Sequence, residues 1–262
     1  MSTSKRYETK NEEAKSAAKT ASPVIETLPT VYLALEVKGT AGLIQNCFSQ
    51  KAVEEMLRKH MGLPVTREKK VPSACIERAT IRNTEGAVCI PPTAFKKAML
   101  TASTLMKGKK KTHLKQQLYV CGNSIPIEYS QMVPRMDMVR TSGMSRTPDV
   151  RFRPMFEDWS AKLLLQFTDD LPVQTIIEML SRAGHVGIGE WRPEKDGTFG
   201  TFEVTANISD TKEIDRIRKA CRPSVRPLVI PEWAMNAEID PSILEKIAHG
   251  DSVETQGEEE DT

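Results

Sequence analysis

The segment AGHVGIGEWRPEKDGTFGTFEV, residues 183–204, holds five of the fourteen glycines of the chain. Glycine loses more conformational entropy on ordering than any other residue, so a dense run indicates positive φ or a close backbone approach. Two interpretations follow. In the first, free backbone amides and Arg192 face an anionic ligand or a neighbouring subunit. In the second, Gly184 caps a helix, while Gly197 and Gly200 form turns.

The segments around this glycine-rich stretch predict a strand, a helix and a second strand. Residues 161–167 and 202–208 alternate apolar and polar side chains, which is typical of half-buried strands. Residues 172–182 place their apolar side chains on one helical face. A strand, helix and strand of these lengths predict a right-handed crossover unit.

The first half of the chain repeats this order. Residues 30–38 alternate as a strand, and residues 93–106 follow helical spacing after two prolines. Two such units in one sheet predict an α+β fold of the ferredoxin-like type, a split βαβ arrangement. We therefore expect the three strands named so far to share one sheet, with both helices on a common face.

Shorter elements are expected between the two units. They are a helix from Ser49 to His60, a strand at 74–81, a turn at 83–86, and strands at 117–121 and 125–129 joined as a hairpin by residues 122–124. Residues 107–111 form a cationic end to the helix at 93–106, suited to the negative helix C-terminus or to phosphate.

The predicted domain organisation has four parts. They are a disordered segment at 1–27, a ferredoxin-like domain at 28–210, a helical extension at 211–250 and an acidic tail at 251–262. An insertion at about 130–155 is expected inside the domain. Its residues 130–150 combine four methionines with three arginines and little periodicity, which favours an irregular binding segment that orders on binding.

Charge is unevenly distributed along the chain. Residues 51–153 contain 20 Lys/Arg against 8 Asp/Glu, although the net charge of the whole chain is only +2. This asymmetry predicts an anionic partner for the middle of the chain. Five cysteines are scattered without a CxxC pair, which argues against a disulfide framework or a zinc site. We expect no metal, no cofactor and no membrane span, and a cytoplasmic protein.

Few residues offer catalytic chemistry. The sequence contains no P-loop, HExxH or GxSxG motif, and Asp169-Asp170 is typical of a helix N-terminus. His185 could act as a general base in a metal-independent endoribonuclease, or it could contact a ligand. Trp191 beside Arg192 could stack on a base and pair with its phosphate; alternatively, Trp191 folds back onto its own loop.

The order of parts resembles a known family. A first strand leads into GTAGLIQN (39–46), and IPPTAFKKA (90–98) opens a helix; the insertion and the glycine-rich stretch follow. This pattern resembles the RAMP superfamily, most closely the backbone subunits that line guide RNA in CRISPR effector complexes. It also looks like uncharacterised proteins of tailed bacteriophages. The resemblance implies a ferredoxin-like core with an inserted thumb, and head-to-tail assembly along a single strand.

On this resemblance, Lys96 and Lys97 would meet the strand backbone, and the glycine-rich stretch would contact nucleic acid or the next subunit. The open sheet face offers Tyr32, Lys162 and Gln166, without the paired aromatics of an RNA-recognition motif.

The sequence therefore predicts a non-enzymatic protein that binds single-stranded RNA or DNA and oligomerises along it. A metal-independent endoribonuclease using His185 and a phage structural or assembly protein are the alternatives. The predicted binding residues are Lys96, Lys97, Lys109, Lys110, Lys111, Arg135, Arg140, Arg146, His185, Trp191 and Arg192. Affinity is expected to come from Lys and Arg on phosphates, with little base readout.

Overall fold

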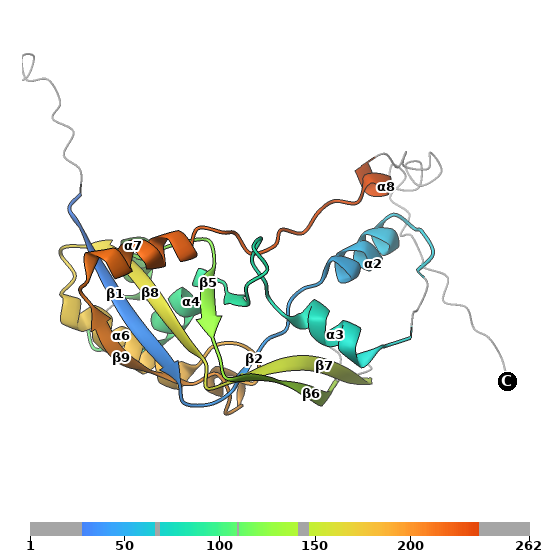
Figure 1. The fold of residues 1–262 in the computed structure, drawn as a ribbon, viewed down its shortest axis with the longest axis horizontal. Helices are drawn as coiled ribbons and strands as arrows, with labels where there is room; N and C mark the ends of the chain where they lie inside the picture. The colour runs from blue at the N-terminus through green and yellow to red at the C-terminus, as the bar shows by residue number, and fades with distance from the viewer. Residues whose placement is uncertain (1–27, 66–68, 109, 141–146, 236–262) are drawn as a thin grey trace, which may run out of the picture.

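The computed structural model describes residues 28–65, 69–108, 110–140 and 147–235, in which helices pack on antiparallel sheets (Figure 1). The chain thus has the α+β fold that the sequence predicts. The segment 1–27 and the tail 251–262, for which disorder was predicted, lie outside the described residues. None of the helices in the described part of the chain is long and apolar enough to cross a membrane.

Within the described chain, six strands form one sheet in the order β3-β5-β8-β1-β9, with β4 also paired to β8. They are β1 (Thr30–Gly39), β3 (Cys89–Ile90), β4 (Leu118–Val120), β5 (Ile125–Glu128), β8 (Ser160–Thr168) and β9 (Phe202–Ile208). β1 lies between β8 and β9 and is antiparallel to both. The expectation that the three long strands share one sheet is confirmed.

The described helices follow the predicted order with additions. They are α2 (Gln50–His60), α3 (Pro72–Ala79), α4 (Pro92–Ala102), α5 (Lys111–Gln117), α6 (Val173–Val186), α7 (Thr211–Ala220) and α8 (Glu232–Met235), with short 3-10 turns η1 (Ser103–Leu105) and η2 (Pro193–Lys195). Ser49 caps α2 as predicted, because its hydroxyl accepts from the Ala52 amide at 3.3 Å. Helices α5 and α8 were not predicted.

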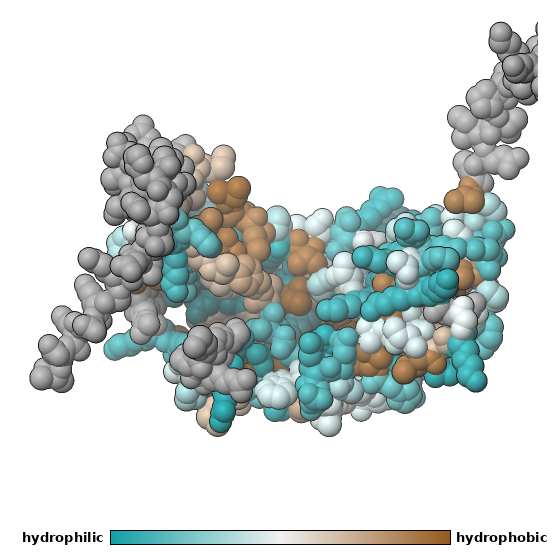
Figure 2. Space-filling model, turned by 180° about the vertical axis from the view of Figure 1, so that it is seen from behind, coloured by the Kyte–Doolittle hydropathy of each residue, from teal (hydrophilic) through white to brown (hydrophobic). Residues whose placement is uncertain are grey.

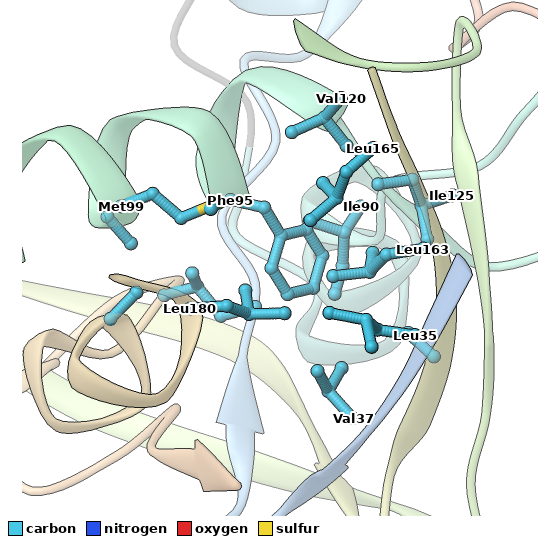
Figure 3. Packing of buried hydrophobic residues seen from close by; sticks show 14 of the residues in the cluster. Leu35, Val37, Ile90, Phe95, Met99, Val120, Ile125, Leu163, Leu165 and Leu180 are labelled. Carbon is cyan, nitrogen blue, oxygen red and sulfur yellow. The ribbon is translucent and has the colours of Figure 1, made fainter. Parts of the chain in front are cut away.

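Helices α4 and α6 pack together on one face of the sheet, and the core lies between them and the strands. Figure 3 shows Phe95 of α4 and Leu180 of α6 beside Leu35 and Leu163 of the sheet. Leu35 and Leu163 are cross-strand partners, and every second residue of a strand faces the same side. The alternation read from the sequence therefore builds this core directly.

Helix α7 lies on the opposite face of the sheet, where it crosses β1 and β8 (Figure 1). The ammonium group of Lys162 donates to the Glu213 carboxylate of α7 at 2.8 Å. The described part of the C-terminal extension thus packs on the domain, and Lys162 does not lie on an open face.

The insertion is a two-stranded ribbon, so the prediction of an irregular segment is wrong for its described residues. Strand β6 (Gln131–Arg140) pairs with β7 (Pro148–Glu157) along its whole length, and β2 (Leu43–Ile44) joins the other side of β7. Charged residues occupy inward positions of the ribbon, and this hides the period of two from a hydrophobicity pattern. Figure 1 shows the ribbon extending away from the main sheet, beneath α3.

Two shorter predictions are also wrong. The strand expected at 74–81 is helix α3, which has Pro72 in its first turn and buries Ile76 and Ala79 three residues apart. The strands β4 and β5 do not form a hairpin, because both pair with β8. The amides of Asn123 and Ser124 instead donate to the Cys221 carbonyl, at 2.7 and 3.3 Å.

Candidate nucleic-acid interface

The glycine-rich stretch begins inside α6. Gly184 is a helical residue and not a cap, because α6 continues to Val186. A β-carbon at position 184 would lie 1.9 Å from the Phe202 carbonyl oxygen. The helix ends two residues later, and Gly187 follows it with a φ of 76°. Glycine at position 184 thus permits close contact between α6 and β9, and glycine at 187 permits a positive φ that other residues rarely adopt.

The backbone after Gly187 hydrogen-bonds within the protein. The Glu190 amide donates to Ile44 and the Gly200 amide to Gly42, both at 2.9 Å. The Ile188 amide donates to Gly200, also at 2.9 Å. The interpretation that free amides here face an anion is therefore wrong for these three donors. The Glu190 and Gly200 amides fix the glycine-rich stretch against β2 and the residues before it, and the Ile188 amide closes the stretch on itself.

The side chain of Arg192 is also engaged internally. Its guanidinium donates twice to the Glu194 carboxylate, at 2.9 and 2.7 Å, and once to the Gly189 carbonyl at 2.8 Å. Hydrogen bonding from Arg192 lowers the pKa of Glu194, and the Thr101 hydroxyl of α4 donates to the same carboxylate. Glu194 thus joins the glycine-rich stretch to α4, and Arg192 uses three of its five N–H donors within the stretch.

Trp191 and His185 lie at the surface of the same region. Trp191 has a φ of 52° and its residue surface is 38% exposed, so both an anchoring and a stacking role stay open. His185 lies exposed in the last turn of α6, and its side chain has no hydrogen-bond partner among the described residues.

The middle of the ribbon packs on the glycine-rich stretch through buried charges. Asp137 accepts from Arg135 at 2.7 Å and lies 3.5 Å from Arg153, whose side chain is only 4% exposed. Arg153 also approaches Glu190 at 3.8 Å, and the Arg135 guanidinium lies 4.6 Å from the ring centroid of Phe199. Arg135 is therefore held in a structural cluster, whereas Arg140 lies exposed at the far end of β6.

A second group of cations lies on α4, on α5 and between them. The group consists of Lys96, Lys97, Lys107, Lys110, Lys111 and Lys115, called here the α4–α5 lysines. None of them lies within ion-pair distance of a described carboxylate, whereas six of the eleven other described cations of residues 51–153 have such a partner. The face that lies behind the sheet in Figure 1 is mostly hydrophilic (Figure 2).

Lys96 and Lys115 lie close enough to repel one another. Burial, and then repulsion from Lys115, lowers the pKa of Lys96. The Lys96 ammonium lies 4.5 Å from the ring centroid of Tyr119 on β4. An anion bound between Lys96 and Lys115 would relieve this repulsion, which makes the pair a candidate anion-binding feature.

The structure thus divides the predicted residues. Lys96, Lys97, Lys110 and Lys111 belong to the α4–α5 lysines, whereas Arg135 and Arg192 are paired elsewhere. Lys109 and Arg146 lie outside the described residues. Sequence reasoning missed Lys115 and Tyr119; the spacing of Lys111 and Lys115 within KTHLKQQ could have indicated a helix with both on one side. Within the described chain, no three His, Cys, Asp or Glu side chains gather as a metal site.

No protein-family model matches the sequence, and no curated protein matches it. Among solved structures, the chain is similar to a chain in the cryo-EM structure of the Type III-B Cmr-beta bound to cognate target RNA. The identity is 10% and the TM-score 0.41; the match covers 78% of this chain and 65% of that chain. At this TM-score, we draw no functional conclusion from the likeness.

Proposed function

We propose that the protein binds single-stranded nucleic acid, RNA or DNA, without cleaving it, and assembles along the strand. The observation that carries the proposal is the group of α4–α5 lysines, none of which forms an ion pair with a described carboxylate, although Lys97 lies near enough to Glu194 to lower its pKa. Clustered cations that are not neutralised within the fold favour an anionic polymer, because phosphate contact releases counterions.

The arrangement of the strands supports the same proposal. The order β5-β8-β1-β9, with α4 and α6 on one face, is the order expected of a ferredoxin-like core. A two-stranded ribbon inserted between β5 and β8 is in keeping with the thumb that a RAMP-type resemblance implies. Assembly along the strand is supported by Met136 and Met138 of the ribbon, which are 68% and 77% exposed. Exposed methionines are suited to an adaptable protein contact.

The test is the salt dependence of binding to a labelled 20-nucleotide single strand of mixed sequence. Each phosphate contact to a single strand contributes a slope of about −0.7 in log affinity against log salt. Replacing Lys96, Lys97 and Lys111 by glutamine should therefore flatten the slope by up to about 2. At 0.1 M salt, the same arithmetic predicts a loss of affinity of about 100-fold.

The matched control is Arg182→Gln, which removes a cation that is already paired with Glu178 at 2.9 Å on α6. It should leave both affinity and slope nearly unchanged. Equal effects of the lysine variant and the Arg182 variant would contradict a localised phosphate site. No binding of wild-type protein to RNA or DNA would contradict the proposed function itself.

The absence of cleavage is part of the proposal and is tested separately. The strand should stay at full length after prolonged incubation with the protein, and His185→Ala should bind it almost normally. Cleavage that His185→Ala abolishes would favour the endoribonuclease alternative. Assembly is tested by light scattering, where the mass of the complex should increase with strand length.

A further inference from the structure

Three polar side chains form a row across the face of the sheet that α7 only partly covers. Tyr119 of β4 pairs in register with Gln166 of β8, and Gln166 pairs with Tyr32 of β1. Side chains at paired positions of antiparallel strands lie on the same face. Neighbouring strands lie about 4.8 Å apart, so the two tyrosines are about 10 Å apart across the row.

The side chains of this row are exposed to solvent, although those of the neighbouring row are buried. Ala34 and Leu164, the next pair on the same face, are each only 2% exposed, and α7 crosses this part of the sheet. By contrast, Tyr32 is 52% exposed and Tyr119 is 50% exposed. Two aromatic side chains of a regular sheet thus remain accessible, on a face where the adjacent positions are buried.

The Tyr119 end of the row is bordered by cations. Lys96 lies 4.5 Å from the Tyr119 ring centroid, and Lys115 lies close enough to Lys96 to lower its pKa. Aromatic side chains beside unpaired cations are the combination that single-strand binders use, since bases stack on rings while cations neutralise phosphates. The positive charge at this end therefore favours a nucleic-acid strand over an apolar protein segment.

We propose that Tyr32 and Tyr119 stack on two bases of one single strand, with Gln166 between them and Lys96 on the phosphate backbone. The Gln166 amide has both donors and an acceptor, so it can contact a base edge or a sugar hydroxyl. This inference rests on the proposed function. It adds the bases of the strand to the phosphates as groups that the protein contacts. It adds stacking to a site that the lysines alone would make purely electrostatic.

The experiment compares two double variants with the wild-type protein on the same 20-nucleotide strand. Tyr32→Leu with Tyr119→Leu removes both rings, whereas Tyr32→Phe with Tyr119→Phe keeps them. Stacking contributes about 1 to 3 kcal/mol per base, and every 1.4 kcal/mol is tenfold in affinity. The leucine variant should therefore bind at least about 10-fold more weakly, while the phenylalanine variant keeps its affinity.

Two further readouts separate stacking from charge and from folding. The salt slope of the leucine variant should equal that of wild-type protein, because no cation is removed. On a strand of abasic sites, wild-type and leucine variant should bind equally. Thermal melting checks that both double variants are folded. If the leucine variant is not folded, the affinity of the phenylalanine variant is the second measurement.

The outcomes distinguish the two proposals. If wild-type protein binds the strand but the folded leucine variant binds equally well, the inference fails and the proposed function stands. Equal losses for both double variants, or a loss that persists on abasic strands, would also overturn it. If wild-type protein binds no strand at all, the proposed function fails, and the stacking inference fails with it.

Discussion

The buried charges in the middle of the ribbon allow a quantitative prediction. Asp137 is 6% exposed and lies between Arg135 and Arg153, and the side chain of Arg153 is 4% exposed. Removing one partner of a buried ion pair costs about 3 to 5 kcal/mol, because a buried charge is left uncompensated. Asp137→Leu should therefore lower the free energy of unfolding by about 3 kcal/mol.

Arg153→Met should cost less, because Asp137 keeps its 2.7 Å bond to Arg135. The double variant should be the mildest, within about 1 kcal/mol of wild-type protein, since an apolar pair of similar volume often replaces a buried ion pair without loss. The charges left behind, on Arg135 and Glu190, reach water with 34% and 42% of their side chains exposed.

Urea denaturation of the four proteins completes a double-mutant cycle. A loss of 3 kcal/mol in a domain of this size corresponds to a decrease of about 6 to 12 °C in melting temperature. The reasoning would be refuted if the double variant lost the sum of the two single losses, because the two side chains would then act independently.

Two further predictions concern the glycine-rich stretch. Gly200→Ala should destabilise the protein far more than Gly108→Ala, measured by urea denaturation. Both glycines have positive φ, 68° and 75°, but a β-carbon at Gly200 would lie 1.8 Å from the Ile188 carbonyl oxygen, whereas one at Gly108 would meet nothing within 4 Å; equal losses would contradict this. Arg192 lowers the pKa of Glu194 below its ordinary value of 4.5, so the stability from this pair is fully present above pH 4.5 and is lost as the pH falls through the lower folded pKa. Glu194→Gln should therefore lose less melting temperature than the wild-type protein when the pH falls from 7 to 3. Equal decreases in melting temperature for the two proteins would contradict the assignment.

Local pattern was sufficient for the central elements of this protein. The alternation in β1, β8 and β9 and the spacing in α4 and α6 are properties of consecutive residues, and the structure has these elements where the sequence predicts them. The lysines at 96, 97, 110 and 111 were also identifiable, because clustered charge is visible in the sequence itself.

The site depended on contacts between distant residues, which local pattern does not contain. Arg135 and Arg192 look like free cations in the sequence, but Asp137 and Glu194 bind them in the fold. The glycines of residues 183–204 serve close backbone packing within the protein, and the sequence could not distinguish that from ligand binding.

Tyr119 is a further residue whose neighbours could not be predicted from local sequence. In the sequence it belongs to a short strand expected to form a hairpin, with no sign of a connection to Tyr32. Pairing of β4 with β8 places it in one row with Tyr32, although 87 positions of sequence separate the two tyrosines. Local sequence pattern indicated the long strands of the main sheet and the face that each of their residues takes. Strand neighbours are decided by tertiary packing, because the backbone hydrogen bonds that join strands are the same for every side chain.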